Sequence, residues 1–304
     1  LLADPEEIFL TDGASDGAKR ILDLLIAEKT DGVMIPIPQY PLYSASIKMF
    51  GGTQTNYYPD EENDWALNRK ILEEAYAQAS AEGVKVKAIV VINPGNPTGA
   101  ILDKESVYEV ISFAKTHNLA IIADEVYQEN LYGGEFTSFA KALGDEKNVV
   151  LFSLHSISKG FYGECGHRGG YLEVRNSPLV AGTELNFIDL LLKQASVSLC
   201  ANSVGQIMTY LMVSPPNSES RVRQKFIVEK EKVLANLYEK AMMVREAFKK
   251  MDGLESFGKT GAMYLFPRLN KLPKGTDDFD YCMALLEETG LCTVNGSGFG
   301  LKNH

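Results

Sequence analysis

The sequence contains little cysteine: four residues in a chain of 304, at Cys165, Cys200, Cys282 and Cys292. They lie far apart, so no two have the spacing of a metal-binding pair, and we expect no metal site. A chain of this length does not need a disulfide framework in order to fold. We therefore expect reduced thiols and a cytoplasmic protein.

Long apolar runs and an excess of positive charge are also missing. No run reaches the ~18 apolar residues of a transmembrane helix, so we expect no membrane partner. The formal net charge is -10, and such an acidic chain is a poor partner for nucleic acid or an anionic membrane. Internal repeats and low-complexity segments are absent as well.

Neither end of the sequence looks like a natural terminus. The first residues contain no methionine and none of the basic, apolar and cleavage regions of a signal peptide. Residues 298–304 look like the middle of a loop. We therefore expect a fragment cut at both ends, and such a cut would remove any targeting segment.

What remains is the composition of a globular protein. Hydrophobic residues make up 45% and charged residues 23% of the chain, which is ordinary for a soluble protein with a sizeable core. The length predicts one large or two medium domains.

Short apolar runs alternate with amphipathic stretches in the first part of the chain. The runs predict strands at residues 7–11, 32–37, 52–58, 86–92, 119–123, 149–152 and 169–173. Helical spacing of apolar residues predicts helices at residues 14–27, 41–50, 68–81 and 103–117. This alternation predicts an α/β fold, with a mostly parallel central sheet and helices on both faces.

The pattern changes after residue 174. Helical spacing dominates residues 179–210, a proline-containing break follows at residues 213–218, and a long charged helix is predicted at residues 222–250. The remainder predicts short strands at residues 254–257 and 262–266, a helix at residues 279–288 and an extended segment at residues 291–294. We expect a large domain over residues 1–215 and a smaller, incomplete α+β C-terminal domain over residues 216–304.

Chemically useful side chains follow four of the predicted strands. They come from residues 12–17, residues 93–99, residues 124–127 and a segment with Lys159 and Arg168. In doubly wound sheets, ligands bind at the carboxyl ends of the strands. The sequence therefore predicts amide, acid, phenol, hydroxyl and amine groups at one edge.

The glycine-containing turn at residues 13–17 opens a predicted helix. Free N–H groups and the helix dipole attract anions such as phosphate at that position, and Ser15 adds a hydroxyl. The carboxylate of Asp16 would repel phosphate, so we expect it to point away and to complement the dipole. An ordinary helix cap is the alternative interpretation.

An amide, a carboxylate and an amine are the other polar groups expected at this edge of the sheet. The rigid loop at residues 93–99 can hold the amide of Asn96 against a ligand. Asp124 ends a buried strand and needs a cation or several donors, although a structural ion pair would also satisfy it. Lys159 is a solvated loop residue, a phosphate ligand or a nucleophile, and Arg168 would serve as neighbouring cation and as phosphate clamp.

One cofactor uses all of these groups together. Pyridoxal phosphate needs a lysine for a Schiff base, an acid beside the pyridine nitrogen, donors for the 3′-oxygen, an aromatic ring to lie against and a phosphate cup. The sequence contains the phrases "LTDGAS", "IPIPQYPLYSA", "NPGNPTG", "ADEVYQENLY", "SLHSISKG", "GECGHRGGY" and "NGSGFG". With them the chain resembles the fold-type I, aspartate-aminotransferase-like enzymes over nearly its whole length. "SKG" followed by "GECGHRGG" is most similar to the alanine aminotransferase subgroup.

The resemblance implies catalytic roles for three residues. Lys159 would form the aldimine with pyridoxal phosphate and then move the proton between Cα and C4′. Asp124 would pair with the pyridinium nitrogen. Tyr127 and Asn96 would hydrogen-bond the 3′-oxygen, and Asn96 would also reach the substrate carboxylate.

It implies binding roles for the remaining site residues. Tyr40 would stack on the cofactor ring. The phosphate would be held by Ala14, Ser15, Asp16, Ser156 and Arg168. A C-terminal arginine for the substrate carboxylate, an N-terminal cover and a tyrosine from a second subunit belong to the family pattern and lie outside this sequence.

The implied function is transamination by a ping-pong mechanism. L-Alanine and 2-oxoglutarate would give pyruvate and L-glutamate, in a homodimer with active sites at the interface. Glutamate:glyoxylate or other amino-acid aminotransferases are alternatives, as are a lyase or a cyclopropane-forming synthase on the same cofactor. A non-catalytic PLP-binding module is the alternative of a different class.

Overall fold

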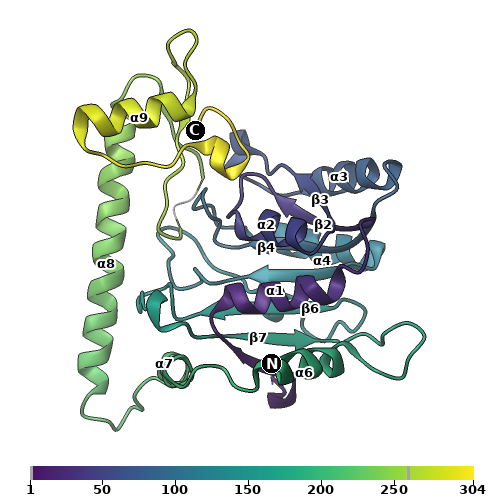
Figure 1. The fold of residues 1–304 in the computed structure, drawn as a ribbon. Coiled ribbons are helices and arrows are strands. Elements are labelled where there is room, and N and C mark those ends of the chain that lie inside the picture. Colours follow the sequence, from purple (N-terminus) through teal and green to yellow (C-terminus); the bar gives the residue numbers. More distant parts are fainter. Residues whose placement is uncertain (1–2, 259–260) are drawn as a thin grey trace.

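The computed structural model describes residues 3–258 and 261–304, and its main feature is a seven-stranded sheet (Figure 1). The strand order is β1-β7-β6-β5-β4-β2-β3. In chain order the strands are β1 (Ile8–Thr11), β2 (Asp31–Pro36), β3 (Thr53–Tyr57), β4 (Lys85–Ile92), β5 (Ala120–Asp124), β6 (Leu151–Ser156) and β7 (Gly170–Arg175). Within this sheet β7 pairs antiparallel with both neighbours, and the other pairs are parallel. The predicted mostly parallel sheet is confirmed.

Helices cover both faces of this sheet. On one face lie α1 (Ala14–Leu25), α2 (Leu42–Met49) and α6 (Phe187–Ser198), whose side chains share one apolar cluster. On the other lie α3 (Arg69–Ala81), α4 (Lys104–His117) and α5 (Phe139–Leu143), which share a second cluster. This arrangement confirms the predicted α/β fold with helices on both faces.

The central strands belong to both clusters at once. On β4, Val90 packs into the first cluster, whereas Ile89 and Val91 pack into the second. Successive side chains of a strand point to opposite faces, so a strand that is buried on both faces has an uninterrupted apolar sequence. That is why residues 86–92 read as a strand without any alternation of polar residues.

The C-terminal part is built differently. After α7 (Ser203–Val213) comes α8 (Arg223–Phe248), which stands away from the sheet with α7 near one end and α9 (Asp278–Thr289) near the other (Figure 1). A small antiparallel sheet pairs β8 (Leu254–Glu255) with β9 (Arg268–Leu269). Among the described residues, none of the helices combines the length and the apolar character needed to cross a membrane.

Two predicted elements of this part differ in the structure. Residues 262–266 were expected to form a strand, but they are irregular, and the second strand lies at β9 instead. The cause lies in the backbone contacts, because Ala262 N–H donates to the carbonyl of Asn130 (2.9 Å) in an irregular loop beyond β5. Residues 291–294 also form no strand.

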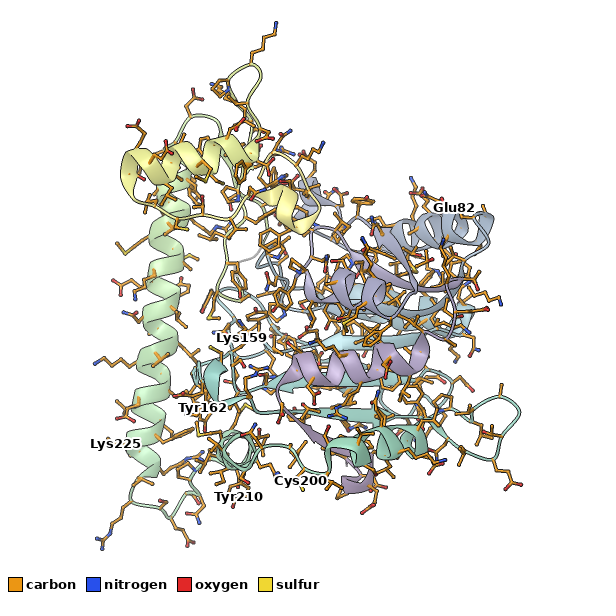
Figure 2. The ribbon with its side chains drawn as sticks, in the orientation of Figure 1. Glu82, Lys159, Tyr162, Cys200, Tyr210 and Lys225 are labelled. Carbon is orange, nitrogen blue, oxygen red and sulfur yellow. The ribbon has the colours of Figure 1, made fainter. Side chains whose placement is uncertain are left out.

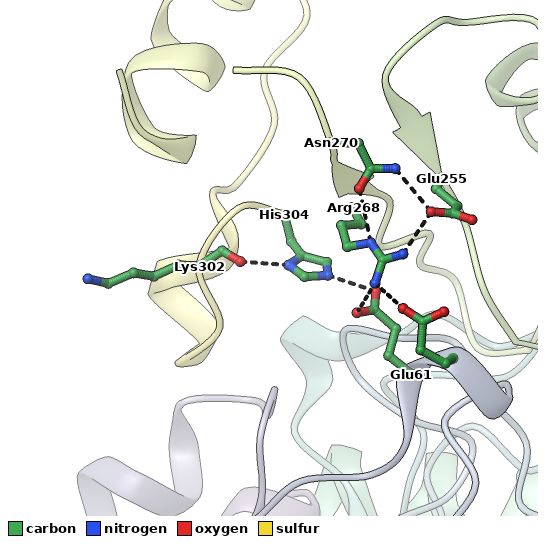
Figure 3. A network of polar contacts seen from close by, with 7 residues as sticks. Glu61, Glu255, Arg268, Asn270, Lys302 and His304 are labelled. Atoms are coloured by element: carbon green, nitrogen blue, oxygen red, sulfur yellow. Dashed lines mark hydrogen bonds and ion pairs between the residues drawn. The ribbon is translucent and has the colours of Figure 1, made fainter. Parts of the chain in front are cut away.

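A polar network joins the C-terminal part to the loop after β3 (Figure 3). Arg268 donates to Glu255 (2.8 Å) of the small sheet and to Glu61 (3.3 Å), which begins the short helix η2 (Glu61–Asn63). The ring of His304 lies 2.8 Å from another oxygen of Glu61. Charged groups from widely separated parts of the chain therefore meet at this junction.

Candidate active site

A pocket of about 180 Å³ lies at the carboxyl ends of the central strands. Figure 2 shows Lys159 at the end of the sheet that faces α8. Nine of the ten site residues expected from the sequence line this pocket: Ala14, Ser15, Tyr40, Asn96, Asp124, Tyr127, Ser156, Lys159 and Arg168. The expectation that separate strand ends deliver their polar groups to one place therefore agrees with the fold.

Lys159 reaches the pocket from the loop after β6. Its Nζ lies 3.4 Å from the hydroxyl of Tyr264 and 5.4 Å from the ring centre of Tyr127. The two phenols are 2.8 Å apart, and Asn96 Nδ2 donates to the hydroxyl of Tyr127 (3.2 Å). Burial and the neighbouring Tyr264 raise the pKa of Tyr127 well above its ordinary value. Tyr127 is therefore a neutral hydroxyl that can donate a proton in a hydrogen bond.

Asp124, the last residue of β5, supplies a buried carboxylate that is only half satisfied. Tyr43 donates to Oδ2 (2.7 Å), while Oδ1 is buried and has no hydrogen-bond partner among the described residues. Burial raises the pKa of Asp124, although Tyr43, the Val126 N–H and the charge of Lys159 oppose this effect. A buried oxygen without a partner is costly. The pocket therefore offers a fixed acceptor for a cationic N–H group.

The opposite end of the pocket is suited to an anion. Gly13 caps α1, and the first N–H groups of a helix, here those of Ala14 and Ser15, have no intrahelical acceptor. The Arg168 guanidinium donates to the carbonyls of Asp12 and Cys165, both at 2.8 Å. The dipole of α1 and the positive guanidinium thus act on the same space.

Gly13 lies in close contact with Arg168 at the anion end of the pocket. Its φ of +89° favours glycine, and a Cβ at this position would lie 2.5 Å from Arg168 Nη2. Arg168 itself has a φ of +53°, which is uncommon for a residue with a side chain. The close contact between the start of α1 and the guanidinium therefore depends on the backbone conformations of both Gly13 and Arg168.

Serine hydroxyls connect the anion end to the lysine loop. Ser158 N–H donates to Ser156 Oγ (3.0 Å), and the two hydroxyl oxygens are 2.9 Å apart. Arg168 Nη1 lies 3.4 Å from Ser158 Oγ. Ser158 also lines the pocket, between Ser156 and Arg168.

Asp16 is the one expected site residue that does not line the pocket. Its carboxylate accepts from Arg20 Nε (3.0 Å) and from the Asp12 N–H (3.3 Å), and its own N–H donates to the Gly13 carbonyl (3.1 Å). The side chain points away from the anion end, in the orientation expected from charge repulsion. The backbone N–H of Asp16 is already used within the helix, so this geometry gives no support to Asp16 as a phosphate ligand.

Sequence reasoning missed two tyrosines of the site. Tyr43 follows Tyr40 by three positions and is fully buried, so its helical spacing indicates only a core residue. Tyr264 lies in the predicted strand at residues 262–266, 105 positions from Lys159. For Tyr43 the only signal in the sequence was its place in the phrase "IPIPQYPLYSA". For Tyr264 the sequence contained no signal.

Comparison with known proteins identifies the family of this site. The model of the family "Aminotransferase class I and II" matches residues 1–304. The chain belongs to this aminotransferase family. The family and its fold imply dependence on pyridoxal phosphate.

Curated relatives agree with this assignment, and a solved structure has the same fold. A probable mitochondrial alanine aminotransferase of Dictyostelium discoideum is 42% identical over 99% of this chain and 58% of its own length. Glutamate–glyoxylate aminotransferase 2 of Arabidopsis thaliana is 42% identical over 99% of this chain and 64% of its own length. The chain thus spans less than two thirds of these relatives. The solved alanine aminotransferase of Pyrococcus furiosus has the same fold, with a TM-score of 0.83 at 24% identity over 99% of this chain and 70% of that one.

Proposed function

We propose that the chain forms the cofactor site of a PLP-dependent aminotransferase that acts on L-alanine and 2-oxoglutarate. The products would be pyruvate and L-glutamate, formed in two half-reactions. The observation that carries the proposal is that one pocket contains both the Lys159 amine and Asp124 Oδ1, a buried oxygen with no hydrogen-bond partner among the described residues. The names of the relatives supply the choice of alanine.

The residues present fit pyridoxal phosphate. Lys159 would hold it through its amine, and Asp124 Oδ1 would accept a hydrogen bond from its ring nitrogen. The N–H groups of Ala14 and Ser15 would hold the phosphate at the helix end. Ser156 and Arg168 would complete the phosphate cup, and Tyr40 would lie against the ring. When bound, this cofactor draws electrons away from Cα of the amino acid and so acidifies the Cα proton.

The remaining chemistry belongs to side chains of this chain. Lys159 Nζ would remove the proton from Cα of the amino acid and deliver it to C4′ of the cofactor. Tyr127, held neutral by burial, would donate its hydroxyl proton to the 3′-oxygen. Asn96 uses one N–H on Tyr127, and its second N–H would be directed at the substrate carboxylate.

Exchange between glutamate and glyoxylate is the second candidate. The relative named glutamate–glyoxylate aminotransferase 2 has the same identity to this chain as the Dictyostelium alanine enzyme. The groups described here recognise the cofactor rather than the substrate side chain, so they serve either pair. A lyase or cyclopropane-forming reaction, or a non-catalytic module, would keep the same cofactor contacts and lack the transfer of nitrogen.

We also propose a homodimer with active sites at the interface. Apolar side chains of α6, α7 and the intervening segment are strongly exposed: Val197, Leu199, Val204, Ile207, Tyr210, Leu211 and Val213 are between 46% and 85% accessible. Exposed apolar side chains on successive elements of this kind are typical of protein–protein contacts. A second copy of the chain is the partner that we propose, because most soluble oligomers are symmetric homo-oligomers.

The division into a large domain over residues 1–215 and a small domain over residues 216–304 is a proposal as well. It is supported by the position of the small β8–β9 sheet, which lies after α8 and outside the seven-stranded sheet. The cytoplasmic location stays a prediction, and the Dictyostelium relative is named as mitochondrial.

Product analysis tests the proposed function. The cofactor-loaded protein is supplied with L-alanine and 2-oxoglutarate, or with L-glutamate and glyoxylate, and the oxo and amino acids are quantified. Equal amounts of pyruvate and glutamate from the first pair support the proposal. Turnover of only the second pair would select the alternative, and release of ammonia or a ring-containing product would contradict transamination.

A further inference from the structure

Tyr264 brings a side chain from the C-terminal part directly to the reacting amine. Its hydroxyl lies 3.4 Å from Lys159 Nζ and 2.8 Å from the hydroxyl of Tyr127. The rings of Tyr264 and Tyr127 meet edge to face, with centres 5.5 Å apart and planes at 82°. Tyr264 is therefore held both by its hydroxyl and by its ring.

Counting hydrogen-bond donors shows what this hydroxyl does. In this contact the Lys159 amine is the donor, so the Tyr264 oxygen accepts its hydrogen bond. Asn96 Nδ2 occupies one acceptor position of Tyr127. The two phenols have one proton each and share one hydrogen bond, so one phenol proton is left to point into the pocket. Removing the Tyr264 hydroxyl would release both the amine and Tyr127 from this arrangement.

The backbone that carries Tyr264 is fixed against the loop at residues 93–99. Gly261 N–H donates to the carbonyl of Gly99 (2.7 Å). A Cβ on Gly99 would lie 2.7 Å from the carbonyl oxygen of Tyr264 and 2.9 Å from that of Gly261, and its φ is +68°. The close approach therefore depends on the absence of a side chain at position 99.

Asn130 ties the same segment to the lysine loop. Its backbone carbonyl accepts from the Ala262 N–H (2.9 Å). Its side chain, which is fully buried, accepts from the Gly160 N–H (3.0 Å) and donates to the Gly160 carbonyl (3.3 Å). The residue that follows Lys159 and the segment that carries Tyr264 are thus anchored on one buried residue.

We propose that Tyr264 is a positioning residue, which orients the Lys159 amine and the Tyr127 hydroxyl for proton transfer in the pocket. The nature of the transferred proton rests on the proposed function. The contacts of the hydroxyl do not depend on it.

The test replaces the hydroxyl and keeps the ring, with Tyr264→Phe in the cofactor-loaded protein. The absorption spectrum is recorded over a series of pH values, and the pH at which its change is half complete is the midpoint. This midpoint should shift by about half to one pH unit, the scale of one hydrogen bond. A shift of the midpoint to lower pH would mean that the contact with the amine dominates, and a shift to higher pH would mean that the contact with Tyr127 dominates.

Kinetic measurements give a second readout of the same variant. With L-alanine, kcat should fall roughly fivefold to tenfold while KM changes less than about twofold. L-Alanine deuterated at Cα should show a larger isotope effect than with the wild type.

Tyr57→Phe is the matched control. Tyr57 is also buried, and its hydroxyl donates to the Val90 carbonyl (2.8 Å) outside this pocket. This variant should lose stability but keep the wild-type midpoint and kcat. The proposal is overturned if Tyr264→Phe leaves the midpoint unchanged, or if Tyr57→Phe shifts it equally. If L-alanine does not change the spectrum of the wild-type protein, the proposed function is contradicted. The midpoint of Tyr264→Phe would still decide the role of Tyr264.

Discussion

The sheet end and the C-terminal part contribute to the same pocket in different ways. All six residues of β6, which leads to Lys159, are buried, whereas none of the 26 residues of α8 is. The sheet therefore fixes the amine and the Asp124 carboxylate through packing on both of its faces. The C-terminal part places Tyr264 through a few backbone hydrogen bonds and ion pairs. Removing a group at the sheet end should consequently reduce activity or stability more than removing a contact from the C-terminal part.

The largest effect should come from Lys159→Ala. Under the proposed function, removal of the amine would take away both the cofactor linkage and the base, so turnover should fall roughly 10³-fold or more. The measurement is the rate of pyruvate formation together with the absorption spectrum. Lys230→Ala is the control, because Lys230 pairs with Glu129 (2.6 Å) and does not line the pocket. Equal loss in both variants would contradict the assignment of Lys159.

Arg168→Lys should weaken cofactor binding. A lysine cannot reproduce the two hydrogen bonds of the guanidinium to Asp12 and Cys165, and it makes a single point contact with a phosphate. Charged hydrogen bonds of this kind are worth about 1.5–3 kcal/mol, so the Kd for pyridoxal phosphate should rise on the order of 10- to 100-fold. Equilibrium titration of the cofactor measures it. Arg69→Lys on α3 should leave the Kd unchanged.

Glu125→Gln should change how stability depends on pH. Burial raises the pKa of Glu125 to about 8, although the Phe139 N–H that donates to it acts in the opposite direction. The unfolded value is about 4.3, so the folded protein binds the extra proton between these pH values, and stability falls as pH rises through this range.

The glutamine variant cannot ionise and should lose this part of the pH dependence. At pH 8 it should be more stable relative to the wild type than at pH 5, by about 1–3 kcal/mol. Urea unfolding at both pH values gives the difference. The exposed Glu109→Gln serves as control. Parallel stability curves for wild type and Glu125→Gln would mean that Glu125 titrates normally.

The smallest effect should follow from Arg268→Ala at the junction in Figure 3. Arg268 pairs with Glu61, Glu62 and Glu255 but is partly exposed, so solvent screens these ion pairs. We expect a loss of about 0.5–1 kcal/mol and faster hydrogen exchange in residues 261–269, with exchange in β5 and β6 unchanged. Faster exchange in the sheet as well would contradict the separation of the two regions.

Sequence patterns predicted the sheet end well, because its signals are local. Uninterrupted apolar runs marked the central strands, and the polar residues directly after them line the pocket. Tyr43 was missed because its hydroxyl meets Asp124 across 81 positions, while its spacing indicates only burial. Tyr264 was missed because backbone contacts to Gly99 and Asn130 override the apolar pattern that predicted a strand at residues 262–266.

The C-terminal part was less predictable for a related reason. Its strands β8 and β9 have two residues each, too short for a periodic pattern. The long helix α8 was predicted within two residues at each end, since a charged helix of that length has a clear sequence signature. Asp16 is the site residue for which the resemblance and the geometry diverge, because its polar groups are used within α1.

The central claim is that Lys159 and Asp124 form a pyridoxal phosphate site that acts on an amino acid. The most direct measurement is the absorption spectrum of the protein with added pyridoxal phosphate, before and after addition of L-alanine. We predict a band of lysine-bound cofactor that L-alanine converts to the band of the aminated form, and that 2-oxoglutarate restores. Absence of any lysine-bound band would contradict the role of Lys159 and with it the proposed site.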